Sequence, residues 1–374
     1  MKILHMADQH LGLASYGRPV EEFGATLMTF SRAAVLEQVD VAVIAGDLFH
    51  SRRPGPAEIL LAVRAIRVLT EAGIDTVIGP GNHDGMGTIA DPGSHTLAWM
   101  AELALNRVHV ATGPELIETP KACFAVLPYA HRRSIESTAT LRERTDEASR
   151  VLEQTINDLG ARQLARGRGV PNVFVGHLTT VSARLGSEAA MQLGWDTTVD
   201  PAVFDRFDVA CLGHIHVRQV VSEKAFYAGS PDVHGFDDQP AEEKGFWLHE
   251  GDQGTPWTHR FVPSRPRAFL TIDVAEGFRQ PVEIPTGAVV RLRFLDRNPS
   301  PASIRERVAF LKDAGASFVK VVVPEPERRY RGQSAELGEL PIKAQMERWL
   351  EVNGHPKEPA LSIAVDVISS FSAE

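Results

Sequence analysis

The sequence is poor in cysteine and has no long apolar run. Its 374 residues include 2 cysteines, Cys123 and Cys211, which lie in separate apolar segments. A disulfide framework and a CxxC metal site are therefore excluded, and reduced core thiols are expected. No segment approaches the roughly 18 apolar residues of a membrane span, and polar residues in the opening MKILHMADQH interrupt any signal-peptide core. We expect a cytoplasmic protein without a membrane segment.

Positive charge is also scarce. The chain has 39 Lys and Arg against 48 Asp and Glu, a net charge of −9. A protein of this charge does not coat nucleic acid by electrostatics alone, although the charge is compatible with an enzyme that takes phosphodiesters through a metal site. Basic clusters at 131–134, 161–169, 263–268 and 327–332 are either ordinary solvated surface or, together, a phosphate-binding rim.

Three common functional motifs are missing. The sequence has no GxSxG segment and no Walker A segment. GPGNHDG at 79–85 differs from GxGxxG because its third glycine comes one residue late, and the following MGTIADPG does not predict a helix. These absences argue against a serine hydrolase, a P-loop ATPase and a dinucleotide-binding protein.

Strand-like and helix-like segments alternate over residues 1–265. Short apolar runs between helices are typical of strands buried on both faces, which predicts an α/β fold of layered sheets flanked by helices. Helices are expected at 24–38 and 57–73, and strands at 2–7, 40–46, 75–79, 108–112, 123–129, 172–176, 208–213, 225–229 and 245–250.

The pattern changes at 263–267, where PSRPR is typical of a linker. Strands and a helix at 300–315, which begins with Ser-Pro and ends at glycine, predict a smaller α+β domain over 268–330. Two amphipathic helices predict a hairpin over 338–374, which either packs on its own domain or docks a partner. Domains of 1–265 and 268–330 followed by this hairpin are therefore expected.

Five strand-like segments of the first domain end on aspartate, asparagine or histidine. Each segment alone is also ordinary turn chemistry, but five in succession beside glycines are hard to explain as turns. The carboxyl ends of parallel strands meet at one crevice of an α/β sheet, so we expect one site. Its candidate residues are Asp8, His10, Asp47, Asn82, His83, Asp84, His177, His214 and His216.

These residue types suit a pair of metal ions. Carboxylate and amide oxygens mixed with imidazole nitrogens favour Mn, Fe or Zn over Ca or Mg alone. Two cations ~3.5–4 Å apart repel each other, and Asp47, the lone carboxylate of its segment, is the natural bridge between them. His50 and His234 lie close to these segments and their roles stay open. Structural roles are expected for His95, His109, His131, His249 and His259.

The blocks DQH, GD, GNHD, GH and GHIH occur in the order of the signature of calcineurin-like metallophosphoesterases, which the chain resembles. Within that superfamily, MKILHMADQHLG, GDLFH and YAGSPDVHGFDD are similar to segments of SbcD-type nuclease subunits. The part after residue 268 occupies the place of their capping domain. The chain departs from the SbcD pattern at Gln9, where an aromatic residue is usual, and at His50, where an aspartate is usual.

The resemblance implies two manganese ions. One would be held by Asp8, His10, Asp47 and His216, and the other by Asp47, Asn82, His177 and His214. Water would attack a DNA phosphodiester in line, His83 would protonate or stabilise the leaving oxygen, and Asp84 would orient His83.

The resemblance also implies a biological setting. Exonuclease action on duplex ends and endonuclease action on single strands, in DNA repair and recombination, would be gated by an SbcC-like ATPase in a complex with a nuclease homodimer. Two alternatives stay open: a phosphatase or cyclic-nucleotide phosphodiesterase with the same site, and a non-catalytic scaffold that holds DNA ends for an ATPase.

Overall fold

The computed structural model describes residues 1–85, 96–97, 99–100, 106–130, 141–167, 169–186, 197–238, 243–274, 283–296, 298–324 and 350. The chain divides into a unit Met1–Val322 and a unit Val323–Glu374. The predicted hairpin over 338–374 lies outside the described residues apart from one position. None of the helices in the described ranges is both long enough and apolar enough to span a membrane.

Six strands form the first sheet of the larger unit, in the order β14-β13-β1-β2-β3-β4. The four strands at one side of this order are parallel: β1 (Lys2–Met6), β2 (Val41–Ala45), β3 (Asp75–Gly79) and β4 (Val108–Val110). β13 (Gly245–Glu250) and β14 (Thr258–Pro263) add an antiparallel edge. Every residue of β2 and β3 is buried, including the polar Asp75 and Thr76 at the start of β3, as expected for central strands covered on both faces.

The second sheet has the order β11-β12-β10-β7-β6-β5. Its central strands β12 (Ala225–Tyr227), β10 (Val209–Gly213), β7 (Asn172–His177) and β6 (Cys123–Leu127) are parallel. β11 (Gln219–Val220) and β5 (Glu115–Glu118) are antiparallel edges. A two-stranded pair, β8 (Thr179–Thr180) and β9 (Thr198–Val199), and a 3-10 helix, Pro201–Phe204, lie nearby in the sequence.

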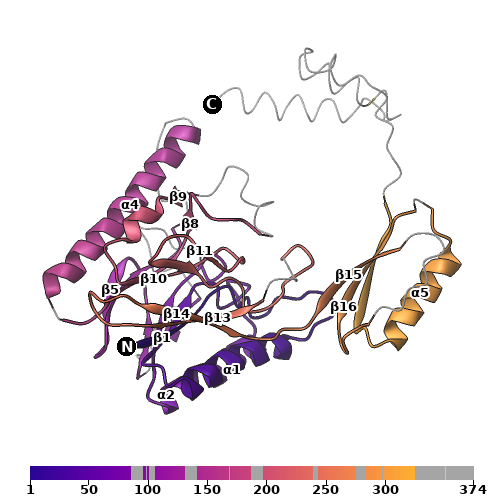
Figure 1. The fold of residues 1–374 in the computed structure, drawn as a ribbon, viewed down its shortest axis with the longest axis horizontal. Helices are drawn as coiled ribbons and strands as arrows, with labels where there is room; N and C mark the ends of the chain where they lie inside the picture. The colour runs from indigo at the N-terminus through magenta and orange to yellow at the C-terminus, as the bar shows by residue number, and fades with distance from the viewer. Residues whose placement is uncertain are drawn as a thin grey trace. The chain divides into compact units, whose positions relative to one another are not determined.

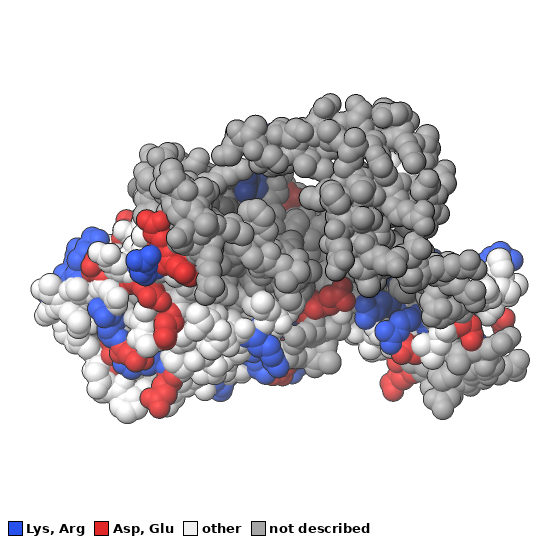
Figure 2. Space-filling model, turned by 90° about the horizontal axis from the view of Figure 1, so that it is seen from above, with Lys and Arg blue, Asp and Glu red and all other residues white. Residues whose placement is uncertain are grey.

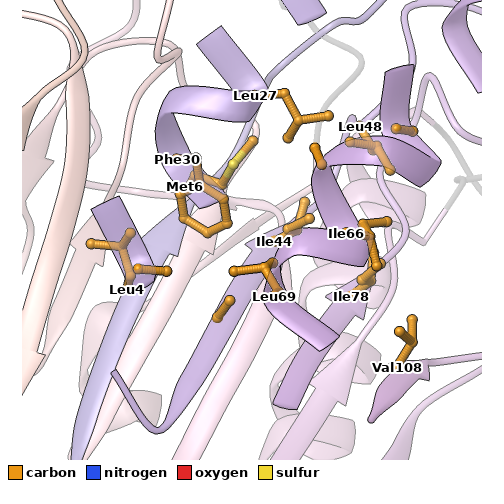
Figure 3. Close-up of a cluster of buried hydrophobic side chains, with 14 of the residues drawn as sticks. Leu4, Met6, Leu27, Phe30, Ile44, Leu48, Ile66, Leu69, Ile78 and Val108 are labelled. Carbon is orange, nitrogen blue, oxygen red and sulfur yellow. The ribbon is translucent and has the colours of Figure 1, made fainter. Parts of the chain in front are cut away.

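The two sheets face each other and each has helices on its outer face (Figure 1). α1 (Val20–Leu36) and α2 (Pro56–Glu71) cover the first sheet, and α4 (Leu141–Arg166) covers the second. Figure 3 shows Leu4, Met6, Ile44 and Ile78 of the strands against Leu27, Phe30, Ile66 and Leu69 of the two helices. A second apolar cluster, including Val43, Val77, Val126, Val175 and Cys211, fills the space between the sheets. The result is the predicted layered α/β fold.

A three-stranded parallel sheet follows near the end of the larger unit. It consists of β15 (Phe269–Val274), β16 (Val289–Phe294) and β17 (Phe318–Val322), with α5 (Pro301–Asp313) between the last two. The Ser300 hydroxyl caps α5 by accepting a hydrogen bond from the Ser303 amide at 3.1 Å. The strands and helix predicted here are confirmed, while the division into domains 1–265 and 268–330 stays a prediction.

Candidate metal centre

The predicted strand ends meet at one edge of the sandwich, but they come from both sheets. β1 leads to Asp8 and His10, β2 to Asp47, and β3 to Asn82 and His83. From the second sheet, β7 ends at His177, and β10 leads to His214 and His216. The sheets are tied together here, because the His177 Nδ1–H donates to the Ala45 carbonyl at 2.8 Å and the His214 amide donates to Asp8 at 3.0 Å. The site is therefore a seam between two sheets.

The backbone at this seam adopts conformations that ordinary residues rarely take. Among the described residues, 8 non-glycine residues have positive φ, and 4 of them are predicted ligands: Asp8, His10, Asp47 and His214. Left-handed backbone at a non-glycine residue costs roughly 1–3 kcal/mol. Such strain concentrates at functional sites, so its clustering here supports a role for these four side chains beyond packing.

Two glycines of the motif blocks make room for the site. Gly46 has a φ of +93°, and a Cβ on it would collide with the His177 ring. A Cβ on Gly81 would collide with Asp47. The glycines of the GD and GN blocks are therefore required by close approach as well as by turn geometry.

One group of donor atoms comprises Asp47, Asn82, His177 and His214. The Asn82 Oδ1 atom lies 3.0 Å from His177 Nε2 and 3.1 Å from His214 Nδ1. His177 Nε2 lies 3.4 Å from Asp47 Oδ2. Donors of one ion, each about 2.0–2.2 Å from it, lie roughly 3 to 3.5 Å apart. The spacing of this group fits a single divalent ion.

A second group comprises Asp8, His10, Asp47 and His216. His10 Nε2 lies 3.2 Å from His216 Nε2 and 3.5 Å from Asp47 Oδ2. Asp8, His10 and Asp47 offer ligand atoms within 4.8 Å of one another. The Asp47 Oδ2 atom belongs to both groups, which is the position that a bridging carboxylate needs.

Neighbouring groups determine which ring nitrogen or oxygen faces the centre. The Ala45 carbonyl fixes the proton of His177 on Nδ1, so that Nε2 faces Asn82. Asp47 accepts the His83 amide on Oδ1 at 2.8 Å, which leaves Oδ2 for the two donor groups. Asp238 Oδ1 lies 3.6 Å from the Nδ1 of His216, on the side of the ring away from His10. The donors are thus pre-oriented.

The buried acids and histidines compensate each other's charge. Burial raises the pKa of Asp8 above its ordinary value. Burial has the same effect on Asp47, but His177 and His10 outweigh it and lower the pKa of that carboxyl. Burial lowers the pKa of His177, but Asp47 and Asp8 outweigh it and raise the pKa to about 9. A cation bound here would take the place of the His177 proton beside Asp47.

His83 lies beside the second donor group, with its ring 4.6 Å from that of His10. Its Nδ1–H donates to the His50 carbonyl at 2.9 Å, and the His50 ring stacks on it at a centroid distance of 5.1 Å. The carbonyl is an acceptor only, so the proton of neutral His83 is on Nδ1 and Nε2 is the nitrogen available for proton transfer.

Asp84 does not hold the His83 ring, which corrects the role expected from the sequence. It is completely buried and accepts backbone amides of Leu48 at 3.3 Å, Phe49 at 3.0 Å and Gly81 at 2.9 Å. Burial and the nearby Asp47 raise the pKa of Asp84 to about 6. The carboxylate positions the loops that carry Asp47 and His83, so its effect on the ring is indirect.

Several residues near the donors were missed or left open by the sequence. An open groove of about 580 Å³ is lined by His50, Ser51, Arg52, Arg53, Asn82, His83 and Tyr129. The exposed Arg52 and Arg53 come after GDLFH and Ser51, and this position beside a motif block could have indicated that they line the site. His50 Nδ1 also lies 3.2 Å from His10 Nδ1, and the His234 ring lies 4.9 Å from that of His10. Both histidines therefore belong to the site.

Other positions lie away from the groove. Gln9 is buried and its Nε2 donates to the Phe23 carbonyl at 3.0 Å, so it is not a groove residue. His109 pairs with Asp75 at 3.1 Å, and the His249 and His259 rings approach to 2.8 Å, in agreement with structural roles. His95 and His131 lie outside the described residues.

A four-layer α/β sandwich with clustered Asp, Asn and His at its strand ends defines a metal-dependent phosphoesterase fold. Residues 1–218 match the family model described as calcineurin-like phosphoesterase, and the chain belongs to this family. The family implies divalent metal ions, and the described donor atoms fit them.

Two curated relatives within this family are similar to the chain over most of its length. The chain is 29% identical over 286 residues to the SbcD component of the nuclease SbcCD from Staphylococcus saprophyticus, covering 74% of this chain and 72% of that protein. It is 27% identical, with the same coverage, to the protein of the same name from Staphylococcus epidermidis. A solved structure of a dimetal phosphatase from Danio rerio matches at 14% identity with a TM-score of 0.36, covering 70% of this chain and 98% of that one.

Proposed function

We propose that the chain is a divalent-metal-dependent DNA nuclease, the SbcD-like subunit of an SbcC–SbcD-type complex. The observation that carries the proposal is the pair of donor groups that share Asp47 Oδ2, with His83 and an open groove beside them. Similarity to the SbcD components of SbcCD nucleases supports DNA over a small ester as the substrate. We assign it duplex-end exonuclease and single-strand endonuclease activity in DNA repair and recombination, in the cytoplasm.

The proposed assembly is a homodimer bound to an SbcC-like ATPase. The chain contains no Walker A segment, so an ATPase partner would supply any ATP-dependent gating. Manganese is the proposed metal.

Two divalent ions in the donor groups would supply the Lewis acidity that activates water and neutralises phosphate charge. Asp47 would hold both ions and would itself be held by the His83 amide. His83, with Nδ1 fixed by the His50 carbonyl, would donate a proton from Nε2 to the leaving sugar oxygen. The reaction therefore requires His83 in its protonated form before the bond breaks.

The groove arginines would position the nucleic acid. Arg52 and Arg53 line the groove that contains Asn82 and His83, and guanidinium groups bind phosphate oxygens in a bidentate manner. On the described part of the face in Figure 2, basic and acidic side chains are interspersed. We therefore infer that DNA binding depends on the groove and its ions, since the net charge of −9 provides no general attraction.

The test compares substrates with the purified protein and manganese. End-labelled duplex DNA, circular single-stranded DNA, bis(p-nitrophenyl) phosphate, p-nitrophenyl phosphate and a cyclic nucleotide are offered to the wild type and to Asp47→Asn. We expect the wild type to cleave DNA and the Asp47→Asn variant not to cleave it. Hydrolysis restricted to the monoester or the cyclic nucleotide would replace the nuclease with a phosphatase or cyclic-nucleotide phosphodiesterase. DNA binding without hydrolysis of any substrate, in any divalent metal, would indicate a scaffold.

A further inference from the structure

His234 is a histidine beside the second donor group that the family signature does not include. It follows β12 in the described segment 228–238. Its ring meets those of His10 and His216 nearly edge-on, at centroid distances of 4.9 Å and 4.8 Å. Nitrogen atoms of the three rings lie within 4.8 Å of one another, the spacing of a candidate metal site.

The Nε2 atom of His234 is buried and has no hydrogen-bond partner among the described residues. Leaving such an atom unpaired costs about 1–3 kcal/mol. Buried histidines elsewhere in the chain avoid this cost: His5 Nε2 faces the Leu212 carbonyl at 3.2 Å, and His249 Nδ1 faces His259 at 2.8 Å. His234 differs from these structural histidines because its ring nitrogen lacks a partner within the described part of the chain.

The loop that carries His234 is held firmly, so the ring position is determined by the fold. The His234 amide donates to Asp238 at 3.0 Å, and Arg18 donates to the Val233 carbonyl at 2.6 Å. Asp238 also faces His216 Nδ1 at 3.6 Å. One carboxylate therefore contacts both the backbone of His234 and the ring of a predicted ligand, which couples the positions of the two histidines.

We propose that His234 is an additional ligand of the ion held by Asp8, His10, Asp47 and His216, and that it shifts this position towards nitrogen-preferring metals. This inference rests on the proposed metal centre. With His234, the ion has three imidazole and two carboxylate ligands, and without it two of each. The additional imidazole increases the preference for Co²⁺, Fe²⁺ or Zn²⁺ over Mn²⁺. Five protein donors leave a six-coordinate ion one further position, so His234 also limits how many oxygens from substrate or water this ion can accept.

The experiment measures metal binding rather than turnover. His234→Leu and His234→Gln are compared with the wild type by calorimetric titration with Co²⁺ and with Mn²⁺. His109→Leu is the matched control, since His109 is a partly buried histidine that pairs with Asp75 at the start of β3, and His216→Leu removes a predicted ligand. We expect both His234 variants to lose tenfold or more in Co²⁺ affinity at one of two sites, with a smaller loss for Mn²⁺.

A structural readout separates ligation from packing. In the Co²⁺-loaded protein, proton NMR should show one fewer hyperfine-shifted exchangeable imidazole resonance in each His234 variant and an unchanged number in His109→Leu. Unfolding curves in chelator show whether each variant is folded, and the glutamine variant keeps a polar side chain if leucine disturbs the loop. Unchanged affinity, selectivity and resonance count in a folded His234 variant would overturn the inference while leaving the metal centre in place. If the wild type binds no divalent ion, the metal centre itself is refuted.

Discussion

Replacement of His83 by alanine should separate the chemical step from metal binding. The His83 amide, which holds Asp47 at 2.8 Å, is a backbone group and remains in the variant. The variant loses the hydrogen bond from Nδ1 to the His50 carbonyl at 2.9 Å and the ring contacts with His50 and His10. We therefore expect the stability to fall by about 1–3 kcal/mol, the sum of one ordinary hydrogen bond and the ring contacts, and the affinity for both ions to stay close to that of the wild type.

The effect on catalysis should be much larger and should depend on the leaving group. General acid catalysis contributes roughly 10²–10⁴-fold, which corresponds to about 2.7–5.4 kcal/mol of transition-state stabilisation. DNA cleavage expels a strongly basic sugar alkoxide that needs the proton. Bis(p-nitrophenyl) phosphate expels a weakly basic phenolate that does not. The variant should therefore lose 10²–10⁴-fold in kcat on DNA and less than about tenfold on the phenyl diester.

The assay is steady-state kinetics on both substrates at saturating metal, with metal content measured on the same samples. His109→Ala, a histidine paired with Asp75 away from the groove, is the control for general effects of losing an imidazole. Equal losses on DNA and on the phenyl diester would refute the acid role of His83 and point to a positioning role. Loss of metal from the variant would show that the ring, and not only its backbone amide, maintains the centre.

Four further changes test other parts of the structure. Asp47→Asn removes the negative charge of the shared carboxylate, so metal analysis should find at most one ion per chain, compared with the two expected in the wild type. In Gly81→Ala, the new methyl group would collide with Asp47, so both metal content and activity should fall together. Asp84→Asn leaves one acceptor oxygen for three backbone amides, and thermal unfolding should show a loss of about 1–3 kcal/mol. Burial raises the pKa of Glu22, but Arg267 and Arg18 outweigh burial and lower this pKa below its ordinary value of 4.5. The Glu22 carboxylate therefore stabilises the fold above pH 4.5, and this stabilisation is lost as the pH falls further. Glu22→Gln should make the free energy of unfolding less dependent on pH in the acid range.

The strands could be predicted where a buried segment is mostly apolar, and the prediction failed at partly exposed sheet edges. β2 and β3 are buried along their whole length and were located from the sequence. β5 and β14 are sheet edges with partly exposed side chains, so no uninterrupted apolar run marked them. α4 was missed because it is rich in charged residues, although the described side chains on one face pack against the second sheet.

The metal ligands could be predicted as residues, but their surroundings required the fold. The motif blocks indicated Asp8 and His216 directly, because each follows a strand-like run. The resemblance to the family implied that Asp84 orients the ring of His83, its neighbour in the chain. In the structure, their side chains face different partners, the backbone amides and the His50 carbonyl. Adjacent residues in a turn share a backbone, but their side-chain directions depend on groups that are distant in sequence.

The motif blocks depend on one another because they are packed across two sheets. Gly46 must lack a side chain because His177, from the other sheet, occupies the space that a Cβ would need. The Ala45 carbonyl on the same turn then fixes the proton of His177 on Nδ1, which leaves Nε2 for an ion. Likewise the His214 amide donates to Asp8 at 3.0 Å, which orients a carboxylate of the first sheet from a loop of the second. The GD and GH blocks of this chain are therefore matched to each other by contact between the sheets, and Gly46→Ala should displace His177, a ligand from the opposite sheet.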